Sequence, residues 1–171
     1  STGGTISATS ALDNELSQKI LGYIFLSPNF GINNKFANMI SWPFSKYWLK
    51  LILGQNIKHN PRNNLNKKFW TMSYPTNALI PMGKLIKEVN KKDFSTVDKP
   101  ALFYFSMEDK VVDPNKIKKF ISNWGGEITT KIVKLSSKDD KFSHVLAGDI
   151  ISPNQTENAK LIMINWIKNL D

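Results

Sequence analysis

Three residues have the types, and the order along the chain, that nucleophilic catalysis requires: Ser1, Asp109 and His144. A serine hydroxyl is a weak nucleophile until a base takes its proton, and imidazole titrates near neutral pH and can serve as that base. A carboxylate can hold the imidazole in one tautomer and stabilise the imidazolium that forms. The chemistry that this set predicts is acyl transfer through a covalent serine intermediate.

The residues after Ser1 indicate how its hydroxyl could be exposed. Ser1-Thr2-Gly3 matches the second half of G-x-S-x-G, in which the serine occupies a sharp turn between a strand and a helix. In that arrangement the backbone N–H of Thr2 donates one hydrogen bond of an oxyanion hole. Two alternatives stay open. The stretch could be a Gly/Ser/Thr-rich tail, or Ser1 could be a terminal nucleophile that uses its own amine as base, without Asp109 and His144.

Three apolar segments predict the strands that would position these residues. Tyr23–Ser27 and Ala101–Ser106 are continuous apolar runs typical of buried parallel strands, and Ile128–Leu135 alternates like a half-exposed strand near a sheet edge. Asp109 follows the second strand by three residues, and His144 follows the third. Active-site groups of open α/β sheets gather at the carboxyl ends of strands, so we expect the acid and the base to meet there.

Helical patterns flank these strands. Thr5–Ile20 and Thr76–Val89 carry apolar residues at helical spacing, and Asp113-Pro114 combines an N-cap with proline at the first helical position. Ser152-Pro153 opens a final amphipathic helix. Its predicted buried side consists of Leu161, Ile162, Trp166, Ile167 and Leu170.

Residues 31–98, here called the 31–98 segment, have a different character. Strand signals are absent and aromatic residues are frequent, which predicts a helical insertion that covers a pocket as a cap. The apolar stretch from Met39 to Leu53 would suit an acyl chain, and the lysines near it would suit an anionic lipid surface. Gln55–Lys68 is polar, basic and rich in Asn, and is predicted to be an exposed loop.

Other candidate residues have simpler interpretations. Asp113 is predicted to be a helix cap, whereas Asp139, Asp140 and Asp149 are predicted to be loop charges. His59 lies in the polar stretch, where a solvated surface histidine is the default. There is no H-x-x-x-H pattern and no cysteine, so the sequence predicts neither a metal site nor a cofactor.

Composition bounds the class of protein. The chain has 171 residues, 41% hydrophobic and 22% charged, as in one globular domain. The net charge is +9, from 23 Lys and Arg against 14 Asp and Glu, but Arg62 is the sole arginine. Guanidinium groups are the side chains that read phosphates and bases well, so we expect no nucleic-acid partner. No apolar run approaches the roughly 20 residues that span a bilayer.

Four stretches together resemble the C-terminal portion of an α/β-hydrolase of the carboxylesterase, lipase and lysophospholipase type. The chain order serine, acid, histidine is the order of that superfamily. The most distinctive stretch is a proline, an apolar strand, an acidic pair and Asp-x-Val-Val around Asp109. The stretches are Ser1–Gly4, Phe25–Asn29, Pro100–Asp113 and Ser143-His144.

The resemblance implies an α/β fold with a mostly parallel sheet flanked by helices. It implies a core made of residues 1–30 and 99–171, with residues 31–98 as the cap. It also implies that the first half of the sheet is absent from this chain, so a preceding segment of the same protein is an expected partner. The implied activity is a serine hydrolase that cleaves carboxylic esters, with small-molecule or lipid-like substrates and an anionic membrane surface as a further partner. The alternative is an α/β-hydrolase-like binding or scaffold protein without catalysis. The sequence does not define the compartment, and a cytoplasmic location is favoured.

Overall fold

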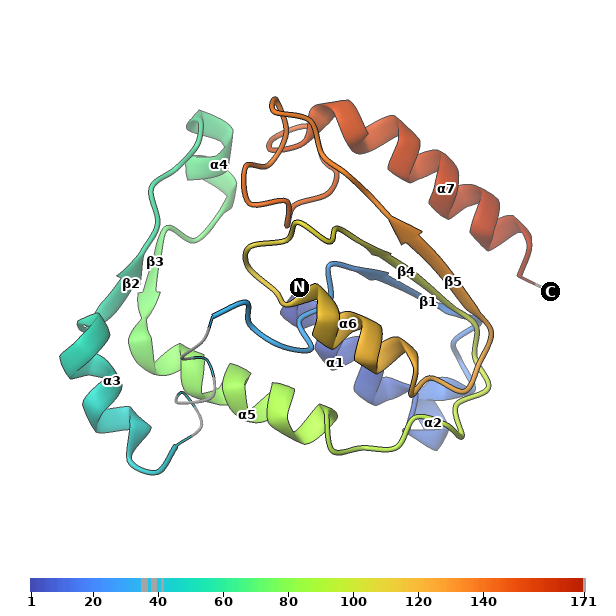
Figure 1. Cartoon of the computed structure of the whole chain (residues 1–171), viewed down its shortest axis with the longest axis horizontal. Coiled ribbons are helices and arrows are strands. Elements are labelled where there is room, and N and C mark those ends of the chain that lie inside the picture. The colour runs from blue at the N-terminus through green and yellow to red at the C-terminus, as the bar shows by residue number, and fades with distance from the viewer. Residues whose placement is uncertain (35–36, 38–39, 41, 171) are drawn as a thin grey trace.

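The computed structural model describes residues 1–34, 37, 40 and 42–170. Its larger sheet contains three parallel strands in the order β1-β4-β5, and a separate antiparallel pair joins β2 to β3 (Figure 1). The strands are β1 Tyr23–Leu26, β2 Asn56–Lys58, β3 Ser73–Pro75, β4 Ala101–Phe105 and β5 Ile128–Ile132. The helices are α1 Thr2–Ser10, α2 Asn14–Ser17, α3 Ser45–Leu53, α4 Asn64–Phe69, α5 Leu79–Val89, α6 Pro114–Ile121 and α7 Thr156–Lys168.

The central strand β4 is buried along its whole length, as its sequence predicts. Its side chains alternate between two faces. Ala101, Phe103 and Phe105 join one core cluster, to which α1 contributes Ala8 and α6 contributes Ile117. On the opposite face Tyr104 packs in a second cluster with residues of α7. The sheet is therefore covered by helices on both faces, as in a doubly wound α/β architecture.

The larger core cluster is dominated by aromatic rings. Phe25 of β1 stacks on Phe103 with ring centroids 4.9 Å apart, and Trp124 meets Phe25 edge-on at 5.6 Å. Val89, Phe94 and Val97 of the 31–98 segment are buried in the same cluster. The boundary between core and cap stays a prediction.

Several predicted elements differ in detail. The helix predicted over Thr5–Ile20 is two helices, because the Asp13 carboxylate accepts hydrogen bonds from the backbone N–H groups of Glu15 and Leu16 and starts α2 there. β1 is not fully buried, since Leu26 is 37% exposed. On α7, Leu161 and Ile167 face solvent instead of the core, 59% and 51% exposed.

The 31–98 segment also departs from its prediction. It contains the β2–β3 pair in addition to helices, and α4 lies inside the stretch predicted to be an exposed loop. Each of these strands is only three residues long, too short for a clear alternating pattern. Met39, the first residue of the predicted acyl-binding stretch, lies outside the described residues. Ser41 also lies outside them. α3 carries Ser45–Leu53 of that stretch, and its apolar side chains include the exposed Leu51 and Ile52.

Candidate active site

Asp109 lies in a short turn after β4 and is 2% exposed. Its Oδ1 accepts hydrogen bonds from the backbone N–H groups of Val111 and Val112, at 2.8 and 2.9 Å. Its backbone carbonyl accepts a hydrogen bond from the Asn33 side-chain amide at 2.7 Å. These bonds fix the carboxylate and leave Oδ2 for a further partner.

That partner is His144, whose Nδ1 lies 2.8 Å from Asp109 Oδ2. The two residues are 35 positions apart and follow neighbouring strands, β4 and β5, so the parallel register brings them together. A carboxylate at Nδ1 favours the tautomer that carries its proton there, which leaves Nε2 free to act as a base. The structure thus places the predicted acid and the predicted base in contact at the carboxyl edge of the sheet.

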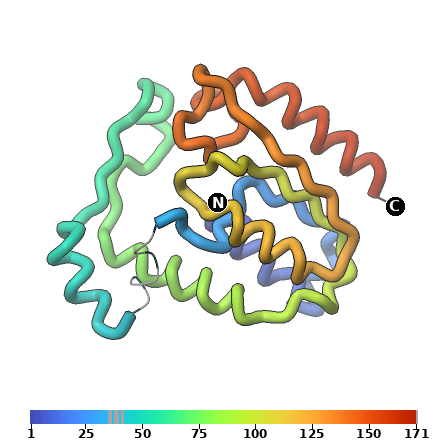
Figure 2. The backbone as a smooth tube through the Cα atoms, viewed as in Figure 1, coloured from blue at the N-terminus to red at the C-terminus, as the bar shows by residue number. Residues whose placement is uncertain are grey.

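Ser1 lies at the same edge. Its amine donates a hydrogen bond to the carbonyl of Leu26, the last residue of β1, at 3.0 Å, and Figure 2 shows the N-terminus beside the loop that follows β4. Ser1 is the N-cap of α1 but makes no side-chain capping bond. Within the described residues, no hydrogen bond joins its hydroxyl to His144.

The close approach of α1 to the end of β1 explains the glycine at position 4. A Cβ atom at Gly4 would lie 3.0 Å from Cβ and 3.3 Å from Cα of Pro28, so a larger residue would push the helix away from the end of β1. Thr2 is the first residue of α1. The first N–H groups of a helix lack intrahelical acceptors, so the N–H of Thr2 is available for an oxyanion.

The loop that carries His144 is organised by Asp140. The Asp140 carboxylate accepts hydrogen bonds from the backbone N–H groups of Phe142, His144 and Val145, at 2.8, 3.1 and 2.7 Å. It also pairs with the Arg62 guanidinium. Ser152 Oγ accepts from the Asp140 N–H at 3.1 Å and donates to the carbonyl of Val145.

The electrostatics of Asp140 follow from these bonds. Burial of its side chain acts to raise its pKa, but the hydrogen bonds from the Val145 and Phe142 amides and from Arg62 outweigh burial. The pKa of Asp140 therefore lies below its ordinary value, and the carboxylate is charged at neutral pH.

The interpretation of the other acids as loop charges was wrong for two of the three. Asp140 and Asp139 are 2% and 8% exposed, and Asp139 accepts hydrogen bonds from Ser136 and Gln155. Asp149 is exposed, as predicted. Asp113 accepts a hydrogen bond from the N–H of Asn115 and caps α6, as predicted.

A cavity of about 920 Å³ opens beside His144. One wall comes from the loop around His144, and the other from β2, α4 and β3 of the 31–98 segment. His59, predicted to be a solvated surface residue, is exposed but lines this cavity, and its ring centroid lies 5.5 Å from that of Tyr74 with the rings tilted by 33°. The cavity has an apolar part formed by Phe69, Trp70, Met72, Val111, Phe142 and Ile151.

Sequence reasoning missed Arg62, Asp140 and Asn33. Two signals could have drawn attention to the first pair: Arg62 is the sole arginine among many lysines, and Asp140 precedes His144 by four residues. Asn33 gave no signal, because its bond to the Asp109 carbonyl joins residues 76 positions apart.

Among the residues that the structure describes, no group of three or more His, Cys, Asp or Glu side chains could hold a metal ion. None of the helices described there combines the length and the apolar character needed to cross a bilayer.

The fold is that of the α/β-hydrolases. No protein-family model and no curated protein matched the sequence. Three similar solved structures are a metagenome-derived lipolytic enzyme from a study of LipS and LipT, a soluble variant of monoglyceride lipase from Saccharomyces cerevisiae in complex with a substrate analog, and a monoacylglycerol lipase from Paleococcus ferrophilus. Their TM-scores are 0.58, 0.64 and 0.63, and their sequence identities are 15%, 16% and 14%.

The matches extend over 99%, 100% and 100% of this chain but only 62%, 63% and 66% of the three structures, in the same order. The chain thus spans less than two thirds of the length of these neighbours. The resemblance predicted from the sequence, to part of an α/β-hydrolase, is confirmed for the fold.

Proposed function

We propose that the protein is a serine hydrolase that cleaves carboxylic esters through an acyl-enzyme. The observation that carries this proposal is the contact between Asp109 Oδ2 and His144 Nδ1 at the sheet edge where Ser1 also lies. In a serine triad, an acid in this geometry holds the imidazole in one tautomer and stabilises the imidazolium. The lipolytic activities in the names of the neighbouring structures point to the same reaction class.

The proposed mechanism assigns one role to each residue. His144 Nε2 takes the proton of Ser1 Oγ as that oxygen attacks the ester carbonyl carbon, and Asp109 stabilises the imidazolium. The Thr2 N–H donates to the oxyanion of the tetrahedral intermediate. His144 then gives its proton to the leaving alkoxide. Water hydrolyses the acyl-serine by the same steps and regenerates the serine.

The cavity beside His144 supports an ester with an apolar portion as the substrate. Its aromatic and aliphatic lining comes from the 31–98 segment and from the loop around His144. The apolar portion of an ester bound there would therefore lie next to the base. We infer that this cavity, rather than the stretch from Met39 to Leu53, accommodates that group.

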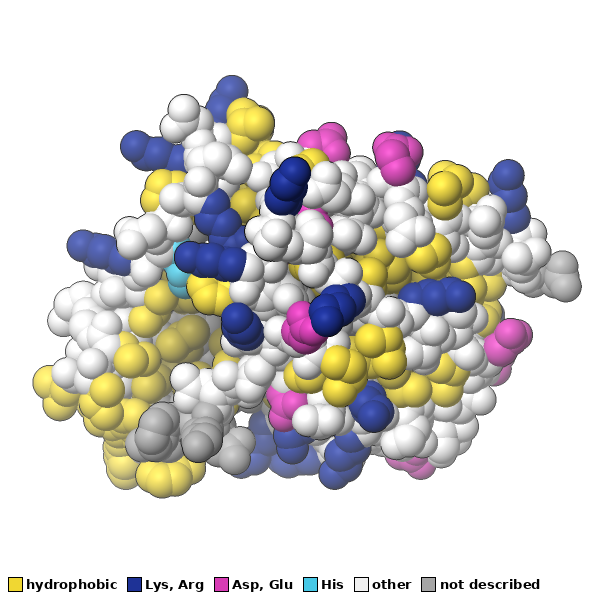
Figure 3. Space-filling view, turned by 45° about the horizontal axis from the view of Figure 1, so that its top comes forward, with side chains coloured by type: hydrophobic (Ala, Val, Ile, Leu, Met, Phe, Trp, Pro, Cys, Tyr) yellow, Lys and Arg dark blue, Asp and Glu magenta, His cyan; other side chains and the backbone are white. Residues whose placement is uncertain are grey.

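An anionic membrane surface is the partner that we propose for α3. Phe44, Tyr47 and Leu51 are 76%, 61% and 86% exposed, and Lys46 and Lys50 belong to the same helix. Figure 3 shows hydrophobic side chains gathered on this side of the molecule. Exposed aromatics with lysines are typical of helices that lie in a lipid interface.

The test is sedimentation of the protein with lipid vesicles. We expect the protein to sediment with vesicles of anionic lipid and to stay in the supernatant with vesicles of zwitterionic lipid. Equal recovery in the supernatant with both kinds of vesicle would contradict the proposal.

The test of the proposed activity is labelling of the full-length protein with a fluorophosphonate, followed by peptide mapping. We expect one adduct on Ser1 that disappears in His144→Ala, because the probe reacts only with an activated serine. A folded protein without an adduct would contradict the proposal and favour a binding protein that has the fold without the catalysis. An adduct on Ser1 that survives in His144→Ala would instead favour the terminal amine as the base.

A further inference from the structure

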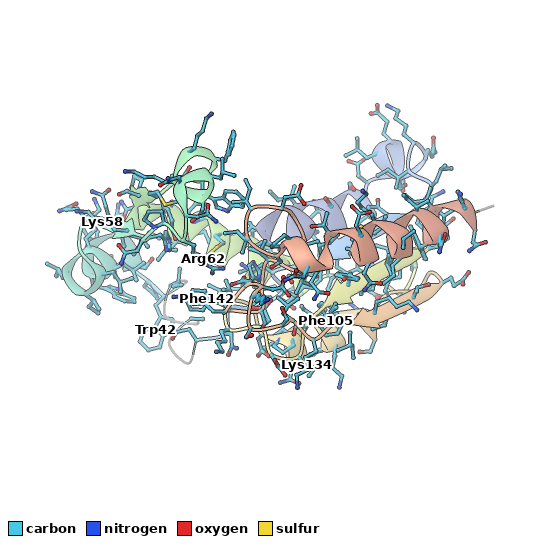
Figure 4. All side chains as sticks on the ribbon, turned by 90° about the horizontal axis from the view of Figure 1, so that it is seen from above. Trp42, Lys58, Arg62, Phe105, Lys134 and Phe142 are labelled. Atoms are coloured by element: carbon cyan, nitrogen blue, oxygen red, sulfur yellow. The ribbon has the colours of Figure 1, made fainter. Side chains whose placement is uncertain are left out.

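Contacts from Arg62 and Asn63 join the 31–98 segment to the loop that carries His144. Arg62, which directly precedes the start of α4, donates from Nη1 to Asp140 Oδ1, and its guanidinium lies 5.0 Å from the centroid of the Phe142 ring. Figure 4 shows Arg62 and Phe142 next to each other. Asn63 adds a second link, from its side-chain amide to the carbonyl of Ile150 at 2.8 Å. These contacts join residues 78 or more positions apart in the sequence.

Arg62 is itself held by the start of α4. The Asn63 Oδ1 accepts a hydrogen bond from the N–H of Asn66 at 2.7 Å, and Asn66 Oδ1 accepts from the N–H of Arg62 at 3.1 Å. The first bond is an N-cap, and the second ties the residue before the N-cap to the first turn of the helix. Because the backbone of Arg62 is fixed in this way, its side chain transmits the position of α4 to Asp140.

The bridge to Asp140 differs from the other lysine and arginine ion pairs of the described residues. The Lys19–Glu15, Lys91–Glu88 and Lys160–Glu157 pairs span a single helical turn, and Lys134–Glu108 joins two loops. All four have exposed side chains, and such pairs contribute little to stability. In the Arg62–Asp140 pair the side chains are 28% and 1% exposed. Arginine suits this place because its planar fork can bind a carboxylate and stack on a ring at once.

We propose that Arg62 is a positioning residue for His144 that acts through Asp140. Asp140 binds the backbone N–H of His144 and of the residue after it, so a shift of Asp140 moves the imidazole relative to Asp109 and Ser1. The placement of the 31–98 segment and the competence of the base are thereby coupled. This inference rests on the proposed function and adds to it a residue outside the triad.

Arg62→Met in the full-length protein is the main test. Asp140 keeps its three backbone donors in this variant, so the loop can still fold. Lys67→Met is the matched control, since it removes one cation from α4 at an exposed position outside the cavity. The readouts are the rate of Ser1 labelling by a small fluorophosphonate, and kcat and KM for a short-chain ester.

We expect the labelling rate and kcat of Arg62→Met to fall about 10- to 100-fold, as for a misplaced catalytic group, with little change in KM. Arg62→Lys should recover part of this loss, because an ammonium can pair with Asp140 but cannot reproduce the fork. Lys67→Met should react like the wild type. A rise in KM with an unchanged labelling rate would overturn the inference, because it would mean that Arg62 contacts substrate instead.

A double-mutant cycle keeps the test decisive even if one variant is poorly stable. In the Asp140→Asn background, Arg62→Met should cause no further loss of labelling rate, since the ion pair between residues 62 and 140 is already lost. Additive losses would overturn the inference. Failure of the proposed function is distinguishable, because in that case the folded wild-type protein is not labelled at all.

Discussion

The two loops that carry the acid and the histidine are built in different ways. The turn after β4 holds Asp109 with bonds from residues two and three positions further on, Val111 and Val112. The loop after β5 holds His144 through Asp140, and Asp140 depends on Ser152 and on Arg62 of the 31–98 segment. The acid is thus placed mainly by local sequence, and the base by contacts from distant parts of the chain.

This difference indicates which part of the site can respond to movements elsewhere in the chain. A group that is held by its immediate neighbours changes only when the turn itself changes. A group held by a distant arginine responds to any shift of the element that carries that arginine. Through Arg62, the 31–98 segment can therefore influence the histidine side of the site. On the acid side, its Asn33 bonds to the Asp109 backbone carbonyl and not to the carboxylate.

The largest expected effect comes from Asp109→Asn. The amide can present the wrong group to the imidazole and favour the wrong tautomer, so kcat should fall about 10,000-fold while the fold is kept. The measurement is ester hydrolysis by the full-length protein. Asp113→Asn is the matched control, because it lies in the same segment and asparagine caps a helix as well as aspartate does. A loss of similar size in both variants would mean that the turn, and not the carboxylate at His144, was disturbed.

A smaller effect, on stability, is expected for Asp140→Asn. The substitution removes the charge that accepts three backbone N–H bonds and leaves the partly exposed Arg62 without its partner. The free energy of unfolding should therefore drop by about 3 kcal/mol at neutral pH. The pKa of Asp140 is lowered on folding, so its contribution is complete above its ordinary value of 3.8 and is lost as the pH falls through the folded-state value.

The check is urea denaturation of both proteins from neutral pH down to the acid range. The difference between wild type and Asp140→Asn should shrink as the pH falls below the ordinary value. Asp149→Asn, at an exposed position in the same loop, should show no such difference. If the difference in free energy of unfolding between wild type and Asp140→Asn stayed constant at all pH values, the carboxylate charge would not stabilise the loop.

The contrast between local and long-range contacts also explains which features of the structure the sequence could predict. β4 could be predicted because an apolar run of this length is typical of a strand buried on both faces, and Asp109 because it follows that strand closely. The start of α6 was found because Asp113-Pro114 is a local signal. The contact between the acid and the base could be expected from parallel strands alone, since their carboxyl ends share one edge.

The parts that escaped prediction depend on long-range contacts or on very short elements. Asp140 lies in a polar stretch that is typical of an exposed loop. Only the fold shows that Arg62, 78 positions away in the sequence, pairs with it. β2 and β3 have too few residues to show a period. The break between α1 and α2 depends on the Asp13 side chain, which competes with the apolar pattern that favoured one long helix.

The smallest of these effects is expected for Ser152→Ala. The Ser152 hydroxyl is fully buried, and its removal leaves the N–H of Asp140 and the carbonyl of Val145 without their partner. An unsatisfied buried group of this kind should lower the free energy of unfolding by about 2 kcal/mol. Ser122→Ala, which removes an exposed hydroxyl that bonds to the Lys119 carbonyl, should cost much less when measured in the same urea series. If the two variants were equally stable, the support that Ser152 gives to the histidine loop would be negligible, and Asp140 with Arg62 would have to hold the loop alone.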